Sequence, residues 1–176
     1  MRKEVDLSDR YAGSRIKQMA ASLSGDGDGI GKIMEWLLHS TDKRVRMNAA
    51  WVLNSLRKED RLRYLAPYRD ALADLAMSAL PFRRQMVLAL LLDFPTEDSP
   101  RIDLLDYCLE HLHDEKEGDS SRAFMIYLAA KMCRPYPELH AELMHTLDML
   151  PPTLPPSIAC ARRKVCADSV KKDNEE

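Results

Sequence analysis

The stretch that decides the fold is Ile30-Gly-Lys-Ile-Met-Glu-Trp-Leu-Leu-His-Ser-Thr-Asp-Lys-Arg-Val-Arg-Met-Asn-Ala-Ala-Trp-Val-Leu53. Its first half has apolar residues at helical spacing, and Asp42 then marks a turn, because a short acidic side chain can cap the helix that follows. In the second half Val45, Ala49 and Val52 lie on one stripe of a helix, at i, i+4 and i+7. The small side chain of Ala49 lets a neighbouring helix approach closely. The stretch therefore predicts a pair of packed helices.

The second half of this stretch returns, with less fidelity, further along the chain. Arg83 lies 37 residues after Arg46, within Phe-Arg-Arg-Gln-Met-Val-Leu-Ala-Leu, and Arg122 lies 39 residues after Arg83, within Ser-Arg-Ala-Phe-Met-Ile-Tyr-Leu-Ala-Ala. A fourth copy, from Ser157 to Cys166, keeps the small residues but has no arginine at the matching place. A repeat of this length is typical of helical solenoids, in which each unit packs on the next.

Apolar residues recur at helical spacing along almost the whole chain, and no segment alternates with the period of two that strands require. Short breaks rich in Gly, Pro and Ser separate about nine segments, as expected between helices. We expect helices at 9–23, 29–39, 43–57, 62–79, 82–93, 101–113, 120–133, 137–149 and 156–168. The polar residues 169–176 are expected to fray.

The repeated pattern resembles the HEAT-like (armadillo-type) α-solenoid family. In that family an apolar first helix is followed by an Asp at the turn and by Val-Arg-x-x-Ala-x-x-x-Leu in the second helix. Here Asp42, Val45, Arg46, Ala49 and Leu53 hold those places. The resemblance implies an all-α, right-handed α-α superhelix of about four helix pairs, forming one domain over 1–168. Its units are expected near 28–57, 60–94, 100–133 and 136–168, with 9–23 as an N-terminal capping helix.

The composition is that of a folded protein without a strong polyanion-binding charge. The 176 residues are 45% hydrophobic and 31% charged, with a formal net charge of −2. No apolar run approaches the roughly 18 residues that span a bilayer, so we expect no membrane contact. The beginning of the chain lacks the apolar segment of a signal peptide. The four cysteines show no C-x-x-C pairing and lie in expected helices, which favours a reducing, cytoplasmic location.

No motif for a cofactor, a metal or catalysis is complete. The Gly-rich segment 24–33 matches a phosphate loop poorly, since Asp26 and Ile33 hold places that require Gly and a hydroxyl. As a calcium loop it has Asp26 and Asp28 at places 1 and 3, but Leu37 stands where the closing carboxylate belongs. The histidines do not have the spacing that stacks two imidazoles on one helix face. We therefore expect no cofactor, no metal site and no catalytic residues, and we lean towards a non-enzymatic protein.

The strongest functional indication lies on the second helices of the units, which line the concave wall of HEAT solenoids. If Val45, Ala49 and Leu53 face the core, the opposite face and its counterparts in later units are candidates for partner binding. These candidates are Arg44, Asn48, Trp51, Leu88, Phe124, Tyr127 and Lys131. Among them, Trp51, Leu88 and Tyr127 form a hypothetical apolar ridge of the kind that protein partners use. The alternatives are that these side chains pack against an adjacent helix, or that the helical register is one residue out.

Charge and the family resemblance leave more than one function open. Residues 42–69 carry eight basic and three acidic side chains, and residues 93–119 carry two basic and ten acidic ones. A scaffold that binds a protein or peptide is the first interpretation. The alternative is a DNA-binding protein resembling the HEAT-like alkylation-repair DNA glycosylases, which the basic stretch permits and the acidic half opposes. A third resemblance, to HEAT-like phycobilin lyases, has no supporting motif.

Overall fold

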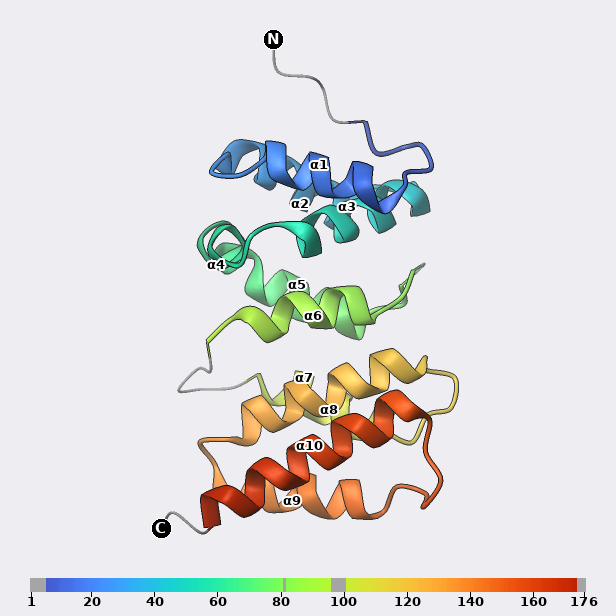
Figure 1. The fold of residues 1–176 in the computed structure, drawn as a ribbon, viewed down its shortest axis with the longest axis vertical. Coiled ribbons are helices and arrows are strands. Elements are labelled where there is room, and N and C mark those ends of the chain that lie inside the picture. Colours follow the sequence, from blue (N-terminus) through green and yellow to red (C-terminus); the bar gives the residue numbers. More distant parts are fainter. Residues whose placement is uncertain (1–5, 81, 96–100, 174–176) are drawn as a thin grey trace. The chain divides into compact units, whose positions relative to one another are not determined.

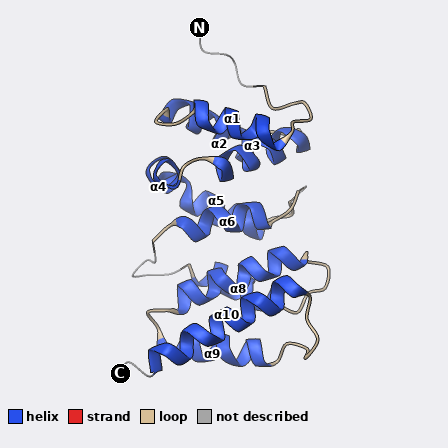
Figure 2. Cartoon of the chain, viewed as in Figure 1, coloured by secondary structure: helices blue, strands red, loops and turns tan. Residues whose placement is uncertain are grey.

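The computed structural model describes residues 6–80, 82–95 and 101–173, and these residues form only helices and connecting loops (Figure 2). They divide into two compact units, one ending at Phe94 and the other beginning at Pro95. The N-terminal unit holds α1 (Gly13–Ser22), α2 (Gly27–His39), α3 (Lys43–Ser55), α4 (Lys58–Leu65), the 3₁₀ turn η1 (Ala66–Tyr68), α5 (Arg69–Met77) and α6 (Gln85–Asp93). The C-terminal unit holds α7 (Ile102–His111), α8 (Asp119–Cys133), α9 (Pro137–Asp148) and α10 (Pro156–Asp173).

The all-α expectation is confirmed, and most helices lie where the sequence places them. The expected helix 62–79 is wrong as a single element, because the chain forms α4, η1 and α5 there. Pro67 lies in the 3₁₀ turn, where its missing N–H and its ring prevent a continuous α-helix. At the other end, α10 continues to Asp173, so the expected polar tail begins as helix. The right hand of the superhelix and the single domain over 1–168 stay predictions.

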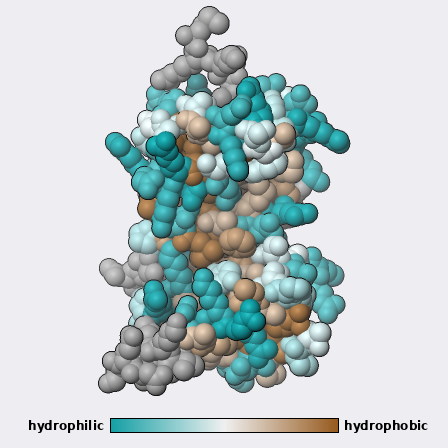
Figure 3. All heavy atoms as spheres, viewed as in Figure 1, coloured by the Kyte–Doolittle hydropathy of each residue, from teal (hydrophilic) through white to brown (hydrophobic). Residues whose placement is uncertain are grey.

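In the N-terminal unit, α3 is the central element. It packs against α2, its partner in the first helix pair, and also against α1 and α6 (Figure 1). Ala49 and Ala50 are fully buried, so neighbouring helices approach α3 closely, as the sequence analysis expected for Ala49. Over α1 to α3 the visible face of the molecule is mostly hydrophilic, with only scattered hydrophobic side chains (Figure 3). Apolar side chains of these helices, such as Ile16, Ile33 and Leu53, lie inside the unit.

Three arginines hold the helix pairs together in the same way. The Nε of Arg46 in α3 donates to the carbonyl oxygen of Leu37 near the end of α2, at 2.9 Å. In the C-terminal unit, the Nε of the buried Arg122 in α8 donates to the carbonyl oxygen of Leu112 at the end of α7, at 2.8 Å. Carbonyls at helix ends lack partners in their own helix, and these guanidinium groups supply them.

The matching arginine of the second pair is Arg84, and not Arg83 as the sequence interpretation had it. Its Nη1 donates to the carbonyl oxygen of Ser78 at 2.8 Å and also to that of Ala76, at the end of α5. Arg46, Arg84 and Arg122 are thus spaced by a constant 38 residues. The next step of 38 falls on Cys160, which agrees with the loss of the arginine expected in the fourth copy.

The C-terminal unit contains two further helix pairs, α7 with α8 and α9 with α10. Here α8 packs on α7, and α10 runs alongside α8 (Figure 1). Side chains link α9 with α10: the Oγ of Ser169 and the Nε2 of His140 lie 2.9 Å apart, and Arg162 forms an ion pair with Asp148.

Candidate functional site

The face of α3 opposite the core carries the candidate site. Asp42 caps the helix by accepting from the backbone N–H groups of Arg44 and Val45 at 2.7 and 3.4 Å, as its sequence position indicated. Arg44 is exposed, and Met47 and Trp51 each keep 37% of their surface accessible. These last two are among the few large apolar side chains that the described part of the chain exposes. The expected exposure of Arg44 and Trp51 therefore agrees with the structure.

Asn48 lies under the N-terminal segment and not on the surface. Only 2% of its surface is exposed, and its amide nitrogen donates to the carbonyl oxygens of Leu7 and Asp9, both at 2.9 Å. A buried amide needs such partners, and the non-helical segment ahead of α1 supplies them. The expectation that Asn48 faces a partner is wrong, because this segment covers it.

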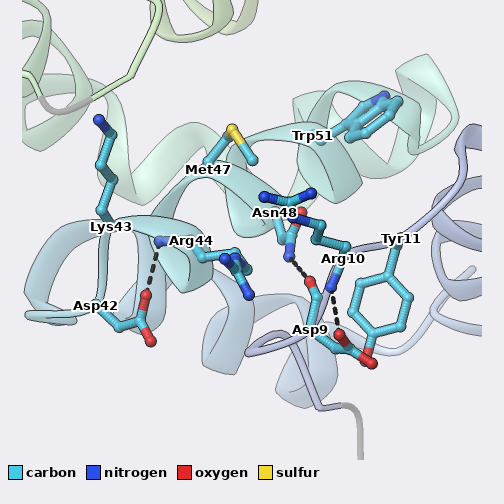
Figure 4. A pocket seen from close by; sticks show the side chains of 9 residues that line it. All are labelled: Asp9, Arg10, Tyr11, Asp42, Lys43, Arg44, Met47, Asn48 and Trp51. Atoms are coloured by element: carbon cyan, nitrogen blue, oxygen red, sulfur yellow. Dashed lines mark hydrogen bonds between the residues drawn. The ribbon is translucent and has the colours of Figure 1, made fainter.

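A pocket lies between that N-terminal segment and the first turns of α3, with a volume of about 690 Å³ (Figure 4). Two chain segments that are distant in the sequence form its walls, Asp9 to Tyr11 on one side and α3 with its cap on the other (Figure 4). Its lining consists of Asp9, Arg10, Tyr11, Asp42, Lys43, Arg44, Met47, Asn48 and Trp51. The pocket brings together three predicted residues, Arg44, Asn48 and Trp51.

The acidic side chains of the pocket accept local backbone hydrogen bonds, whereas the basic ones make few contacts. Asp42 accepts the two helix-capping hydrogen bonds, and the carboxylate of Asp9 accepts from the backbone N–H of Arg10 at 2.7 Å. The Nη1 of Arg44 only reaches the carbonyl oxygen of Ser8 at 3.5 Å. Among the residues that the structure describes, Arg10 and Lys43 have no ion-pair partner. The acids are thus used in local structure, while the cations remain available to a ligand.

Trp51 forms one end of the pocket. A Cβ atom at Gly13, the first residue of α1, would lie 3.5 Å from its Cζ2 atom, so the indole rests against the start of that helix. The residue as a whole keeps 37% of its surface accessible. Trp51 therefore contacts the start of α1 and remains partly exposed at the pocket.

Leu88 does not belong to this surface. It is fully buried in α6, which packs against both α3 and α5. The 38-residue spacing of the arginines makes Leu88 the counterpart of Ala50 and Ile126, which are also fully buried. The interpretation was one residue out of register in this unit, and one residue turns a side chain by about 100° around a helix. The true counterpart of Trp51 is Ala89, so the ridge of Trp51, Leu88 and Tyr127 is wrong at its middle position.

In the C-terminal unit the candidates Phe124, Tyr127 and Lys131 are half-buried on α8. The rings of Phe124 and Tyr127 meet edge to face, with centroids 6.5 Å apart, and the ammonium of Lys164 from α10 lies 5.6 Å from the Tyr127 centroid. Partial burial, with a smaller contribution from Cys160, raises the pKa of Tyr127. This aromatic pair is partly covered by α10, so it presents less surface than Trp51 does.

With this geometry in place, comparison with known proteins identifies the family. The family model described as HEAT repeat domain matches residues 3–169. The chain belongs to the HEAT repeat domain family. No curated protein and no solved structure matches the chain significantly. The family accounts for the helical repeat scaffold.

The Gly-rich segment of this HEAT repeat domain has a structural role. Asp26 accepts from the backbone N–H of Gly29 at 3.1 Å and so caps α2, as expected for an acid at a helix start. Asp60 of α4 accepts from the Oγ of Ser24 and the N–H of Gly25, and Gly25 has a φ of +74°, which favours glycine. Within the described ranges, no three His, Cys, Asp or Glu side chains gather as metal ligands.

The described helices of this HEAT repeat domain include none with the length and apolar character needed to cross a membrane.

The four cysteines differ in how exposed they are. Cys108 and Cys133 are buried, whereas Cys160 is exposed and Cys166 is partly exposed. Burial raises the pKa of the Cys133 thiol to about 11, with Glu142 adding to the effect.

The sequence interpretation missed the half of the pocket that precedes α1. It placed Asp9, Arg10 and Tyr11 inside a capping helix, whereas α1 begins only at Gly13. The Nδ2 of Asn48 fixes this segment by donating to two backbone carbonyls. Every residue has a backbone carbonyl, so such a contact cannot be seen in the residue identities. The one available sign was an amide on the face of α3 next to its alanines, where a buried polar group needs a partner.

Proposed function

We propose that this HEAT repeat domain is a non-catalytic scaffold that binds a protein partner through the second helices of its repeats. The observation that carries the proposal is the pair of accessible apolar side chains on α3, Met47 and Trp51, next to Arg44 at a pocket. Partly exposed aromatic and arginine side chains at a concave site are the residues that most often dominate protein interfaces. The aromatic pair Phe124 and Tyr127, with Lys131 on the same helix, is a secondary contact region on α8.

The test uses alanine variants of the full chain and a partner recovered by affinity capture from the source cells. Trp51→Ala and Tyr127→Ala are expected to weaken binding of that partner, by about 2 kcal/mol for a true anchor, which is roughly 30-fold. Met149→Ala is the matched control, because Met149 is 65% exposed but does not line the pocket. Equal affinity of Trp51→Ala, Tyr127→Ala and the parent chain would contradict the proposal.

A DNA-binding role is the second candidate, and one observation favours it. Arg10, Lys43 and Arg44 line the same pocket as the partly exposed Trp51, and basic side chains beside an aromatic are typical of nucleic-acid sites. Fluorescence anisotropy with a labelled duplex over a series of salt concentrations tests it, because phosphate contacts make the affinity fall steeply with salt. If the duplex does not bind at low salt, this candidate is excluded.

A further inference from the structure

The pocket on α3 combines free positive charge with an accessible apolar surface. Within the described ranges, Arg10 and Lys43 have no ion-pair partner, and the guanidinium of Arg44 makes only the long contact with the carbonyl of Ser8. Met47 and Trp51 line the same pocket. A ligand that satisfies both features must carry negative charge and an apolar group close together.

We propose that this pocket binds an acidic peptide segment that carries an apolar side chain. The carboxylates of the segment pair with Arg10 and Arg44, and its apolar side chain packs on Met47 and the open side of Trp51. Guanidinium groups suit this role because they bind carboxylates through two parallel N–H donors. The inference rests on the proposed function of α3 as a binding surface and specifies the chemistry of the partner.

The balance of charge favours a peptide over a nucleic acid. Three basic and two acidic side chains line the pocket, which leaves a net charge of only +1. The carboxylates of Asp9 and Asp42 would repel a chain of closely spaced phosphates, whereas a peptide can place single carboxylates opposite the arginines. The volume of about 690 Å³ suits a few side chains, since small-ligand sites have a similar size.

The cations are not required for the fold, which makes the proposal testable. The guanidinium of Arg10 takes part in no interaction within the described ranges, so Arg10→Gln should leave the structure intact. The N-terminal segment is held by other groups, chiefly Asn48. Arg57 is a matched control, because it is an exposed arginine in the same unit and does not line the pocket.

The experiment measures the binding of a fluorescein-labelled peptide of glutamates around a central Leu-Phe pair, by fluorescence anisotropy on the full chain. Three probes serve for comparison: the same peptide with glutamines, the same peptide with Ala-Ala in place of Leu-Phe, and a labelled oligothymidylate. The glutamate peptide with Leu-Phe should bind most tightly, and its affinity should fall with salt. Arg10→Gln and Arg44→Gln should each weaken it about tenfold, while Arg57→Gln should change it less than about twofold.

Two results would overturn the proposal. One is equal affinity for the glutamate and glutamine peptides, or equal affinity of the parent, Arg10→Gln and Arg44→Gln chains for the glutamate peptide. The other is tighter binding of the oligothymidylate than of the peptide, which would assign the pocket to nucleic acid. Neither result decides whether the domain is a scaffold. That proposal is tested separately, by the affinity of Trp51→Ala and Tyr127→Ala for the captured partner.

Discussion

At the residue scale, a single type of contact explains why an arginine recurs in this sequence. The end of the first helix in each of these pairs has carbonyl groups without partners in that helix. Arg46, Arg84 and Arg122 each donate to such carbonyls, and their spacing of 38 residues sets the register of the repeats. The arginine therefore marks the repeat more reliably than the apolar residues around it, which tolerate replacement by others of similar size.

Arg122 offers the clearest test of this contact, because only 6% of its surface is exposed. Arg122→Met removes the donor and leaves the carbonyl of Leu112 without its side-chain partner, so we expect a loss of about 2–3 kcal/mol in the free energy of unfolding. Arg163→Met is the control, since Arg163 is exposed on α10 and should change stability by less than about 0.5 kcal/mol. Urea unfolding followed by circular dichroism measures both. Equal stability of the two variants would show that the hydrogen bond of Arg122 does not stabilise the fold.

At the element scale, the sequence predicted helices well where their boundaries are set by local chemistry. Asp42 and the stripe from Val45 place α3 to within two residues of its observed end at Ser55. The prediction failed where tertiary contacts decide. The segment ahead of α1 is not helical and its backbone carbonyls accept from Asn48, a contact that no pattern of apolar residues reports. Leu88 was misplaced because Arg83 and Arg84 are both possible repeat arginines in the sequence, and only the contact with α5 distinguishes them.

The attachment of the N-terminal segment to α3 can be tested through Asn48. Asn48→Ala leaves the carbonyl groups of Leu7 and Asp9 without their donor, so the segment should separate from α3 in a larger fraction of molecules. We expect trypsin to cleave after Arg10 several times faster than in the parent chain. Ser55→Ala is the control, because its hydroxyl bonds only to the carbonyl of Trp51 in its own helix. An unchanged cleavage rate in Asn48→Ala would show that other contacts hold the segment.

The cysteines provide a test of helix burial in the C-terminal unit. At pH 8 the Cys133 thiol, with a pKa of about 11, is almost wholly protonated, and the thiolate is the reactive form. Burial and the raised pKa act in the same direction, so Cys133 should resist iodoacetamide in the native state, as should the buried Cys108. The exposed Cys160 should be alkylated within the same time. Peptide mass spectrometry measures each site, and rapid labelling of Cys133 would mean that the end of α8 is not packed as described.

At the scale of the whole molecule, the repeats are grouped into two compact units with opposite charge. Residues 1–94 contain sixteen basic and twelve acidic side chains, a net of +4, whereas residues 95–176 contain ten basic and sixteen acidic ones, a net of −6. The candidate pocket belongs to the positive unit. The near-neutral total of −2 conceals this division. An acidic partner would therefore be attracted to the N-terminal unit and repelled by the other.

The face of α3 that carries Ala49 is buried in the core, whereas the face that carries Trp51 stays partly accessible. Urea unfolding of Ala49→Glu and Trp51→Ala beside the parent chain tests this division of the helix. Ala49 is fully buried, so a glutamate there should cost more than about 4 kcal/mol or prevent folding. Trp51 is 37% exposed, so its truncation should cost less than about 2 kcal/mol, compared with about 3–5 kcal/mol for a core tryptophan. This division of α3 is contradicted if Trp51→Ala unfolds the protein as readily as Ala49→Glu, or if Ala49→Glu is as stable as the parent.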